Sequence, residues 1–194
     1  MPSLMVFNSI SLDGYFTDAN GDLSWAHAAD PNDQEWNDFV AGNAQGGGAL
    51  VFGRVTYEMM VAYWPTPEAA KAMPKVAEGM NTAQKIVFSR TLNATPWQNT
   101  KIEKGDPVAE IRRLKAGSGP NMVILGSGSI VSQLTQARLI DAYQFVVVPV
   151  VLGQGRTMFD GVRVRLRLKR TSERAFKNGN VLVAYESPAQ HVRA

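Results

Sequence analysis

The sequence contains no cysteine and only two histidines, His27 and His191. The absence of thiols excludes disulfides, thiolate metal sites and cysteine nucleophiles, and two histidines are too few for a histidine-rich metal centre. No apolar run approaches the roughly 18 residues of a membrane span, and no basic region precedes the first apolar run, Leu4–Phe7. The formal net charge of +3 is too small to indicate a nucleic acid partner. We therefore expect a cytoplasmic protein that binds neither membranes nor nucleic acids.

The rest of the composition is that of an ordinary folded protein. The chain has 194 residues, of which 45% are hydrophobic and 19% are charged. Such usage is not typical of disordered chains or long coiled coils. The length suits one large domain and is tight for two. We expect a single domain over residues 1–187, followed by a polar tail over residues 188–194.

Five short apolar runs indicate strands that are buried on both faces. They are rich in β-branched and aromatic residues and lack strict polar alternation, which is typical of a largely parallel sheet. The runs are Leu4–Phe7, Leu50–Phe52, Ile86–Phe88, Met122–Leu125 and Tyr143–Val148. Helix signals separate them, so the sequence predicts an α/β fold.

Three of the predicted helices share one start signal, a capping side chain followed by proline. The pairs are Asp30-Pro31, Thr66-Pro67 and Asp106-Pro107. The side-chain oxygen can accept from the first-turn N–H groups, and proline at the first helical position loses no helical hydrogen bond. A further helix is expected from about Ser127 to Ala137, with apolar residues at helical spacing.

The C-terminal part has a different pattern. Apolar and basic residues alternate over Val162–Lys169, which predicts a half-exposed strand. A turn signal at Lys177–Asn180 precedes a second run, Val181–Tyr185, and the two together predict an antiparallel hairpin. The arginines of the first run would form one solvated strand face, which we favour over a nucleic acid or membrane site.

Glycine, hydroxyl and arginine side chains follow three of the predicted strands. Gly126-Ser127-Gly128-Ser129 follows one strand, Gly53 and Arg54 follow a second, and Ser89 and Arg90 a third. In an open α/β sheet, ligands bind at the carboxyl ends of the strands, where free helix N–H groups attract anions. A tight turn without a ligand is the alternative for each motif alone. All three at one edge favour a phosphorylated ligand, and two arginines suit the 2′-phosphate of NADP.

These motifs give the chain a resemblance to the dihydrofolate reductase superfamily. It is most similar to the reductase domain of bifunctional riboflavin-biosynthesis deaminase/reductases and its stand-alone relatives. The segments that match in order are Ser11-x-Asp13-Gly14, Gly53-Arg54-x-Thr56-Tyr57-Glu58, Val87–Arg90 and Gly126–Ser129. The resemblance implies a dihydrofolate reductase-like, three-layer α/β/α fold, with a mixed, mostly parallel sheet and an antiparallel C-terminal hairpin.

The resemblance also implies NADPH as the cofactor and assigns residues to it. The phosphates would contact Gly53, Arg54, Val55 and Thr56. Ser89 and Arg90 would lie at the adenine ribose and its 2′-phosphate, and Ser9 would border the nicotinamide ring. The residues expected at the pyrophosphate are Gly126, Ser127, Gly128, Ser129 and Ile130.

Two carboxylates are candidates for supporting protonation of the substrate. Asp33 lies three positions before Trp36 and seven before Val40, which predicts a carboxylate on the apolar face of the helix that follows Asp30-Pro31. A carboxylate in a dry cleft has a raised pKa and can act near neutral pH. The alternative for Asp33 is a first-turn residue that stabilises the helix dipole. Asp13 is the rival acid, by its similarity to the riboflavin-type motif.

The expected activity is hydride transfer from NADPH to a C=N or C=O bond of a small pterin- or aminopyrimidine-like substrate. Trp25 and Trp36 would provide an aromatic wall for a flat ring. A non-catalytic NADP-binding protein of the same fold is the alternative. Because Val164, Leu166 and Leu168 could be buried by pairing, and because similar reductases are commonly dimers, we expect a homodimer.

Overall fold

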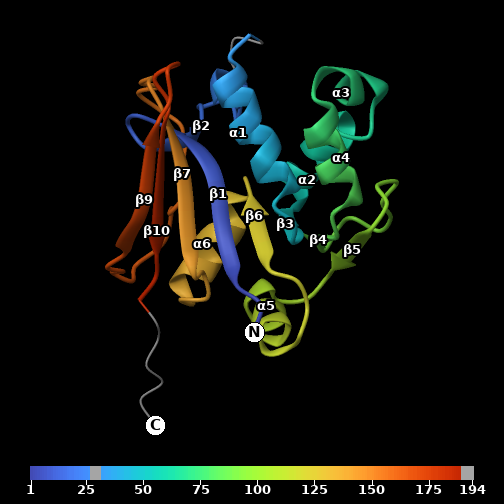
Figure 1. The fold of residues 1–194 in the computed structure, drawn as a ribbon. Coiled ribbons are helices and arrows are strands. Elements are labelled where there is room, and N and C mark those ends of the chain that lie inside the picture. The colour runs from blue at the N-terminus through green and yellow to red at the C-terminus, as the bar shows by residue number, and fades with distance from the viewer. Residues whose placement is uncertain (27–31, 189–194) are drawn as a thin grey trace.

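The computed structural model describes residues 1–26 and 32–188 (Figure 1). Within these residues, eight strands form one sheet in the order β5-β4-β3-β6-β1-β7-β10-β9. Their bounds are β1 Leu4–Ser11, β3 Ala49–Gly53, β4 Lys85–Phe88, β5 Thr100–Glu103, β6 Met122–Leu125, β7 Ala142–Val148, β9 Lys169–Ala175 and β10 Val181–Glu186. Neighbouring strands from β5 to β7 are parallel, whereas β10 is antiparallel to β7 and to β9. The predicted mixed sheet is confirmed.

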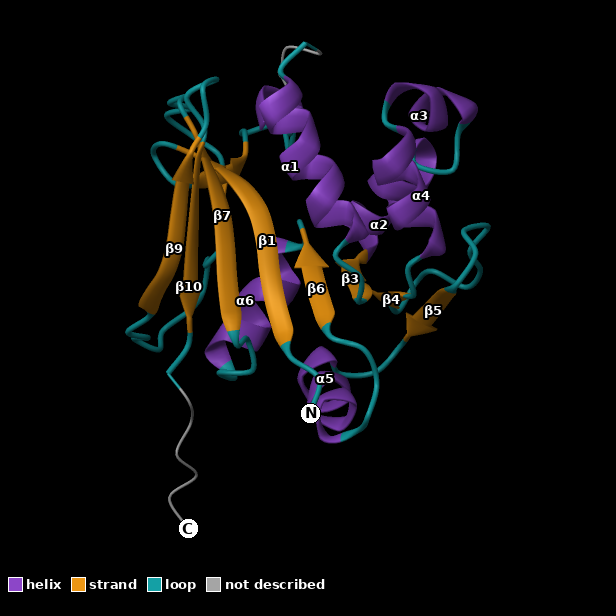
Figure 2. Cartoon of the chain, in the orientation of Figure 1, coloured by secondary structure: helices purple, strands orange, loops and turns teal. Residues whose placement is uncertain are grey.

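Helices cover both faces of this sheet, as Figure 2 shows. Their bounds are α1 Gln34–Gln45, α2 Arg54–Tyr63, α3 Pro67–Ala72, α4 Pro74–Thr82, α5 Pro107–Ala116 and α6 Gly128–Gln136, with a short 3-10 helix η1 at Ser24–Ala26. The helices α1 and α4 lie on one face, and α5 and α6 on the other. A separate two-stranded ribbon joins β2 (Tyr15–Thr17) to β8 (Arg156–Thr157). The predicted three-layer α/β/α arrangement is therefore confirmed.

The two faces of the central strands are covered to different degrees. On the α6 side, Val6, Val51 and Ile124 are fully buried against the helices. On the α1 side, alternate residues of β1 and β6, such as Phe7 and Leu125, are only half-buried. The sequence predicted burial on both faces, and the difference means that α1 and α4 leave part of the sheet uncovered.

One predicted strand is wrong. No residue from Val162 to Leu168 belongs to a strand, and β9 begins only at Lys169. Burial does alternate along the segment, but the N–H groups of Arg163 and Val164 donate to Gln136 Oε1 at 2.9 and 3.3 Å rather than to a neighbouring strand. The hairpin itself is confirmed, because β9 and β10 pair across a turn in which Gly179 has a φ of +88°.

The capping signals predict two of the three helix starts correctly. Thr66 accepts from the N–H of Ala69, and Asp106 accepts from that of Ala109. The Asp30-Pro31 signal lies outside the described residues, and α1 begins at Gln34. Within the part of the chain that the structure describes, no helix combines the length and apolar character needed to cross a membrane. Of the expected polar tail, only Pro188 is described.

Candidate nucleotide and substrate site

The carboxyl ends of β3 and β6 form one hydrogen-bonded unit. The N–H of Gly53 donates to Ser127 Oγ at 2.9 Å, and the N–H of Ser127 donates to Thr56 Oγ1 at 2.9 Å. The Ser127 hydroxyl in turn donates to the Leu125 carbonyl. Ser127 and Thr56 are both buried. Two of the motifs identified in the sequence are therefore brought together and locked by side-chain hydroxyls.

The helices that start from this unit have no side-chain cap. Gly53 and Ser127 are the N-cap residues that precede α2 and α6, and neither helix has a side-chain capping hydrogen bond. Of the other α-helices, α1, α3 and α5 are capped by Asp33, Thr66 and Asp106, and α4 lacks a side-chain cap as well. The first N–H groups of a helix have no intrahelical partner and carry the positive end of its dipole. Two adjacent uncapped helices thus give this edge of the sheet a favourable environment for phosphate.

The backbone at the end of β6 requires glycine and is held from β1. Gly126 and Ser127 adopt left-handed conformations with φ of +56° and +58°. A Cβ at Gly126 would lie 2.7 Å from Thr56 Cγ2, too close for any other residue. Asn8 accepts from the Gly126 N–H at 2.5 Å and donates to its carbonyl at 3.2 Å. Sequence analysis missed Asn8, because it follows the apolar run Leu4–Phe7 and nothing in the local sequence indicates its partner.

Gly128, the first residue of α6, lies against the aromatic ring of Phe16. A Cβ at Gly128 would come within 2.8 Å of two carbon atoms of this ring. Phe16 belongs to β2, so the ribbon of β2 and β8 borders the same edge. The close approach leaves no room for a side chain at Gly128, because the ring of Phe16 covers the start of α6 at this point.

The two arginines predicted to contact phosphate are both exposed. Arg54 Nη1 lies 2.8 Å from Glu58 Oε2, one turn along α2. Such an exposed pair contributes only about 0–1 kcal/mol, so a phosphate could replace Glu58 at little cost. Arg90 follows β4 and makes no ion pair with another described residue. Lys104 donates to the Arg90 carbonyl at 3.1 Å and fixes the backbone there.

The other predicted cofactor residues differ in what they offer a ligand. Ser89 is buried, and its hydroxyl accepts from the Leu92 N–H at 3.0 Å, which holds the loop after β4. Val55 is exposed in the first turn of α2, and Ser129 is exposed in that of α6. Ile130 is a core residue of α6, so only its backbone can face a ligand.

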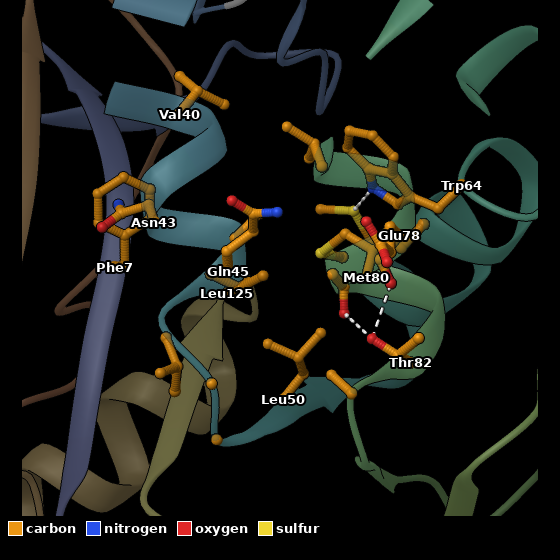
Figure 3. Close-up of a pocket in the computed structure, with 18 of the residues that line it drawn as sticks. Phe7, Val40, Asn43, Gln45, Leu50, Trp64, Glu78, Met80, Thr82 and Leu125 are labelled. Atoms are coloured by element: carbon orange, nitrogen blue, oxygen red, sulfur yellow. Dashed lines mark hydrogen bonds between the residues drawn. The ribbon is translucent and has the colours of Figure 1, made fainter. Parts of the chain in front are cut away.

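Two cavities adjoin this edge of the sheet. The smaller, of about 150 Å³, lies at the carboxyl ends of β1 and β6 and is lined by Asn8, Ser9 and Thr56 among others. The larger, of about 490 Å³, lies between α1, α4 and the uncovered face of the sheet (Figure 3). Phe7, Met60 and Leu125 line both. The two cavities are therefore neighbours at the end of the central strands.

Asp33 does not lie on the apolar face of α1 as predicted. It precedes the first helical residue, and its carboxylate accepts from the Trp36 N–H at 3.0 Å. The prediction placed the helix start three residues too early, so the inward orientation was wrong. The alternative, stabilisation of the helix start, describes the observed geometry.

Asp13 anchors two loops to each other. It accepts from the Ser11 hydroxyl at 2.6 Å and from the N–H groups of Gly153 and Leu152 at 2.7 and 3.2 Å. The hydrogen bond from Ser11, followed by those from the two backbone groups, holds the pKa of Asp13 below its ordinary value of 3.8. A carboxylate with a lowered pKa is a poor proton donor at neutral pH.

The two tryptophans predicted to contact substrate have different surroundings. Trp36 is 8% exposed and packs against Phe39 and Phe176, with ring centroids 5.4 and 5.0 Å away. It is a core residue between α1 and the C-terminal hairpin. Trp25 is half-buried in η1, and its Nε1 donates to the Asp22 carbonyl. Among the described residues, neither tryptophan lines the two cavities.

Comparisons with known proteins agree with this architecture. A family model for the RibD C-terminal domain matches residues 2–182. The uncharacterized protein YyaP of Bacillus subtilis (strain 168) is 28% identical over 178 residues, which cover 91% of this chain and 90% of YyaP. A putative riboflavin biosynthesis protein from Shewanella sp. PV-4 superposes with a TM-score of 0.75 at 23% identity, over 96% of this chain and 99% of that one.

A further solved structure is similar over almost the whole chain. The dihydrofolate reductase from Enterococcus faecalis, complexed with NADP(H) and RAB-propyl, superposes with a TM-score of 0.62 at 16% identity, over 96% of this chain and 97% of that one. The dihydrofolate reductase-like fold inferred from the motifs is therefore confirmed. Because the family model spans nearly all of the sequence, the chain belongs to the RibD C-terminal domain family.

Proposed function

We propose that this protein is an NADPH-dependent reductase that acts on a C=N or C=O bond of a small pterin- or aminopyrimidine-like molecule. The observation that carries the proposal is the pair of uncapped helix N-termini of α2 and α6, joined through Ser127 beside the smaller cavity. The family match and the likeness to a dihydrofolate reductase complexed with NADP(H) support a reductase of this type.

The residues at this edge fit a dinucleotide phosphate. The starts of α2 and α6 have no side-chain cap, so no capping oxygen competes with a phosphate for their first-turn N–H groups, whereas Gly126 and Gly128 are packed against Thr56 and Phe16. In the proposal, the first-turn N–H groups of α2 and α6 hold the phosphates, and Arg54 and Arg90 supply charge to the 2′-phosphate. Ser9 lines the smaller cavity, where the nicotinamide would lie. When bound, NADPH supplies the hydride, and the protein supplies orientation and electrostatics.

The acid that assists the substrate is proposed to be Asp33 or Asp13, and among the described residues neither of them lines the two cavities. The pKa of Asp13 is lowered by its hydrogen bonds, so Asp13 stays ionised at neutral pH. The carboxylate of Asp33 accepts one hydrogen bond from the backbone at the start of α1, whereas the residues of α1 that line the larger cavity begin at Val40. Asp33→Asn should lower turnover about 10²–10⁴-fold with NADPH affinity retained, if Asp33 is the acid. The same result for Asp13→Asn alone would assign the role to Asp13.

A binding protein without turnover is the second candidate. It is favoured by the lining of the smaller cavity, which contains no titratable acid among the described residues. Oxidation of NADPH, followed at its absorbance band with dihydropterins, dihydrofolate and aminouracil ribosides, separates the two. Oxidation with any of them supports the reductase, whereas tight NADPH binding without oxidation supports the binding protein.

Cofactor choice tests the phosphate site directly. Arg90→Ala should weaken NADPH binding by about 1.5–3 kcal/mol, the contribution of a charge-assisted hydrogen bond, and should leave NADH binding unchanged. Arg112→Ala, an exposed arginine of α5, is the matched control. Fluorescence titration of both cofactors measures the effect. Equal affinities of the wild type for NADPH and NADH would refute the assignment.

A further inference from the structure

The larger cavity adjoins a close approach of α1 and α4. A Cβ built at Gly79 would lie only 2.4 Å from the Ala44 carbonyl oxygen, and both residues line the cavity. Three other lining residues, Phe7, Met60 and Leu125, are shared with the smaller cavity. A ring placed at these three residues would face the proposed nicotinamide site, with the rest of the molecule extending between α1 and α4.

Size and lining indicate what could fill this space. About 490 Å³ is in the range of cavities that hold a whole small ligand, and is larger than a two-ring heterocycle requires. In Figure 3, Phe7 and Asn43 lie on one side and Trp64 and Met80 on the other, with Leu50 below. The lining is mostly apolar, so a substituent extending from the ring would be apolar along its length.

The charge on the described lining of the larger cavity is negative. Among its described lining residues, Glu78 is the only one with a charged side chain, and no lysine or arginine is present. Glu78 is exposed on α4 and makes no ion pair with another described residue. Lys85 is buried and does not itself line the cavity, and its Nζ already donates to three backbone carbonyls, including that of the lining residue Ala83 at 2.7 Å.

An anionic substituent would therefore enter the cavity without a partner. Burying a carboxylate or phosphate without an opposite charge is unfavourable, and Glu78 adds repulsion between like charges. An amine would gain a favourable electrostatic interaction with Glu78, and an uncharged apolar group would bury no charge. A ribosyl phosphate or a glutamyl group is poorly suited to this lining.

We propose that the larger cavity binds the substituent of the reductase substrate and selects neutral or cationic apolar groups over anionic ones, with Glu78 as the specificity-determining residue. This inference rests on the proposed function for the location of the reacting ring. It restricts the substrate class to pterin- or aminopyrimidine-like rings that carry an apolar group, uncharged or ending in an amine.

The test uses one pterin ring carrying a hexyl, an aminohexyl or a carboxypentyl group. Calorimetric titration of the full chain, with and without NADPH, measures the affinity for each compound. We expect the carboxylate to bind about tenfold more weakly than the hexyl compound or worse, and the amine to bind at least as tightly. Glu78→Gln should remove the advantage of the amine and reduce the penalty of the carboxylate. Glu68→Gln, an exposed glutamate of α3 outside the cavity, is the matched control.

The outcomes separate this inference from the function on which it rests. Tight binding of the carboxylate, or an order of affinities that Glu78→Gln leaves unchanged, would overturn the selectivity. Failure of all three compounds to bind, with NADPH still bound, would overturn the substrate site and leave the nucleotide site intact. Failure of NADPH itself to bind, with the expected order of affinities preserved, would refute the proposed function and not the selectivity of the cavity.

Discussion

Replacement of Gly126 by alanine should damage both stability and nucleotide binding. The residue has a φ of +56°, which costs an L-amino acid about 1–2 kcal/mol. The added Cβ would lie 2.7 Å from Thr56 Cγ2 and 2.9 Å from Thr56 Oγ1, and overpacking of this kind typically costs about 1–3 kcal/mol. We expect a loss of about 2–5 kcal/mol in the free energy of unfolding.

The clash also displaces the hydroxyl that holds Ser127. Movement of Thr56 would break the hydrogen bond from the Ser127 N–H, so NADPH affinity should fall in the fraction that remains folded. Urea unfolding gives the stability, and fluorescence titration gives the affinity. Gly119→Ala is the control, because nothing lies within 4 Å of its Cβ position and its φ is not left-handed. An unfolding midpoint and an NADPH affinity equal to those of the wild type would refute the reasoning.

Three further predictions concern stability. Gly79→Ala should destabilise the protein by about 1–3 kcal/mol, because the added Cβ would clash with Ala44. Gly42→Ala should stabilise α1 by up to about 1 kcal/mol, because no atom lies within 4 Å of its Cβ position, and urea unfolding of both variants measures the difference. Burial lowers the pKa of Lys85 from 10.5 to about 8, so between pH 8 and pH 10.5 this residue binds more protons in the unfolded chain than in the folded one. In that pH range the free energy of unfolding should therefore rise with pH in the wild type but not in Lys85→Met. The pKa of Asp13 is lowered in the folded protein, so the stabilisation by its carboxylate is present above pH 3.8 and is lost as the pH falls through the pKa of the folded state. The difference in the free energy of unfolding between the wild type and Asp13→Asn should therefore shrink in acid, and an unchanged difference would contradict this.

Apolar runs predicted the central strands because burial dominates their sequence. The edge strand β5, Thr100–Glu103, was not predicted, since its residues Thr-Lys-Ile-Glu include a single apolar side chain and pair only with β4. At Val162–Leu168 the alternation correctly predicted burial, but a strand also needs a hydrogen-bonding neighbour, and Gln136 takes that place. Periodicity reports which side chains are covered and does not report what the backbone binds.

The candidate site, like the strands, was predicted from the sequence only in part. Motifs at the strand ends predicted that Gly53, Thr56 and Ser127 would gather at one edge, because parallel strands end together. The role of Asn8 depends on its distance from Gly126, 118 positions away in the sequence, and no local pattern carries that information. The larger cavity likewise depends on how α1 and α4 meet at Ala44 and Gly79, which only the assembled helices determine.

The helix α2 connects the two parts of the proposed site. Its first turn holds Ser127 through Thr56, and one turn later Met60 lines both cavities. The indole Nε1 of Trp64, just beyond the helix end, donates to Met60 Sδ at 3.1 Å and lines the larger cavity. A shift of α2 on phosphate binding would therefore move Met60 and Trp64 together. The nucleotide edge and the cavity that selects the substrate share a rigid wall, so their geometries are linked through one short helix rather than through mobile loops.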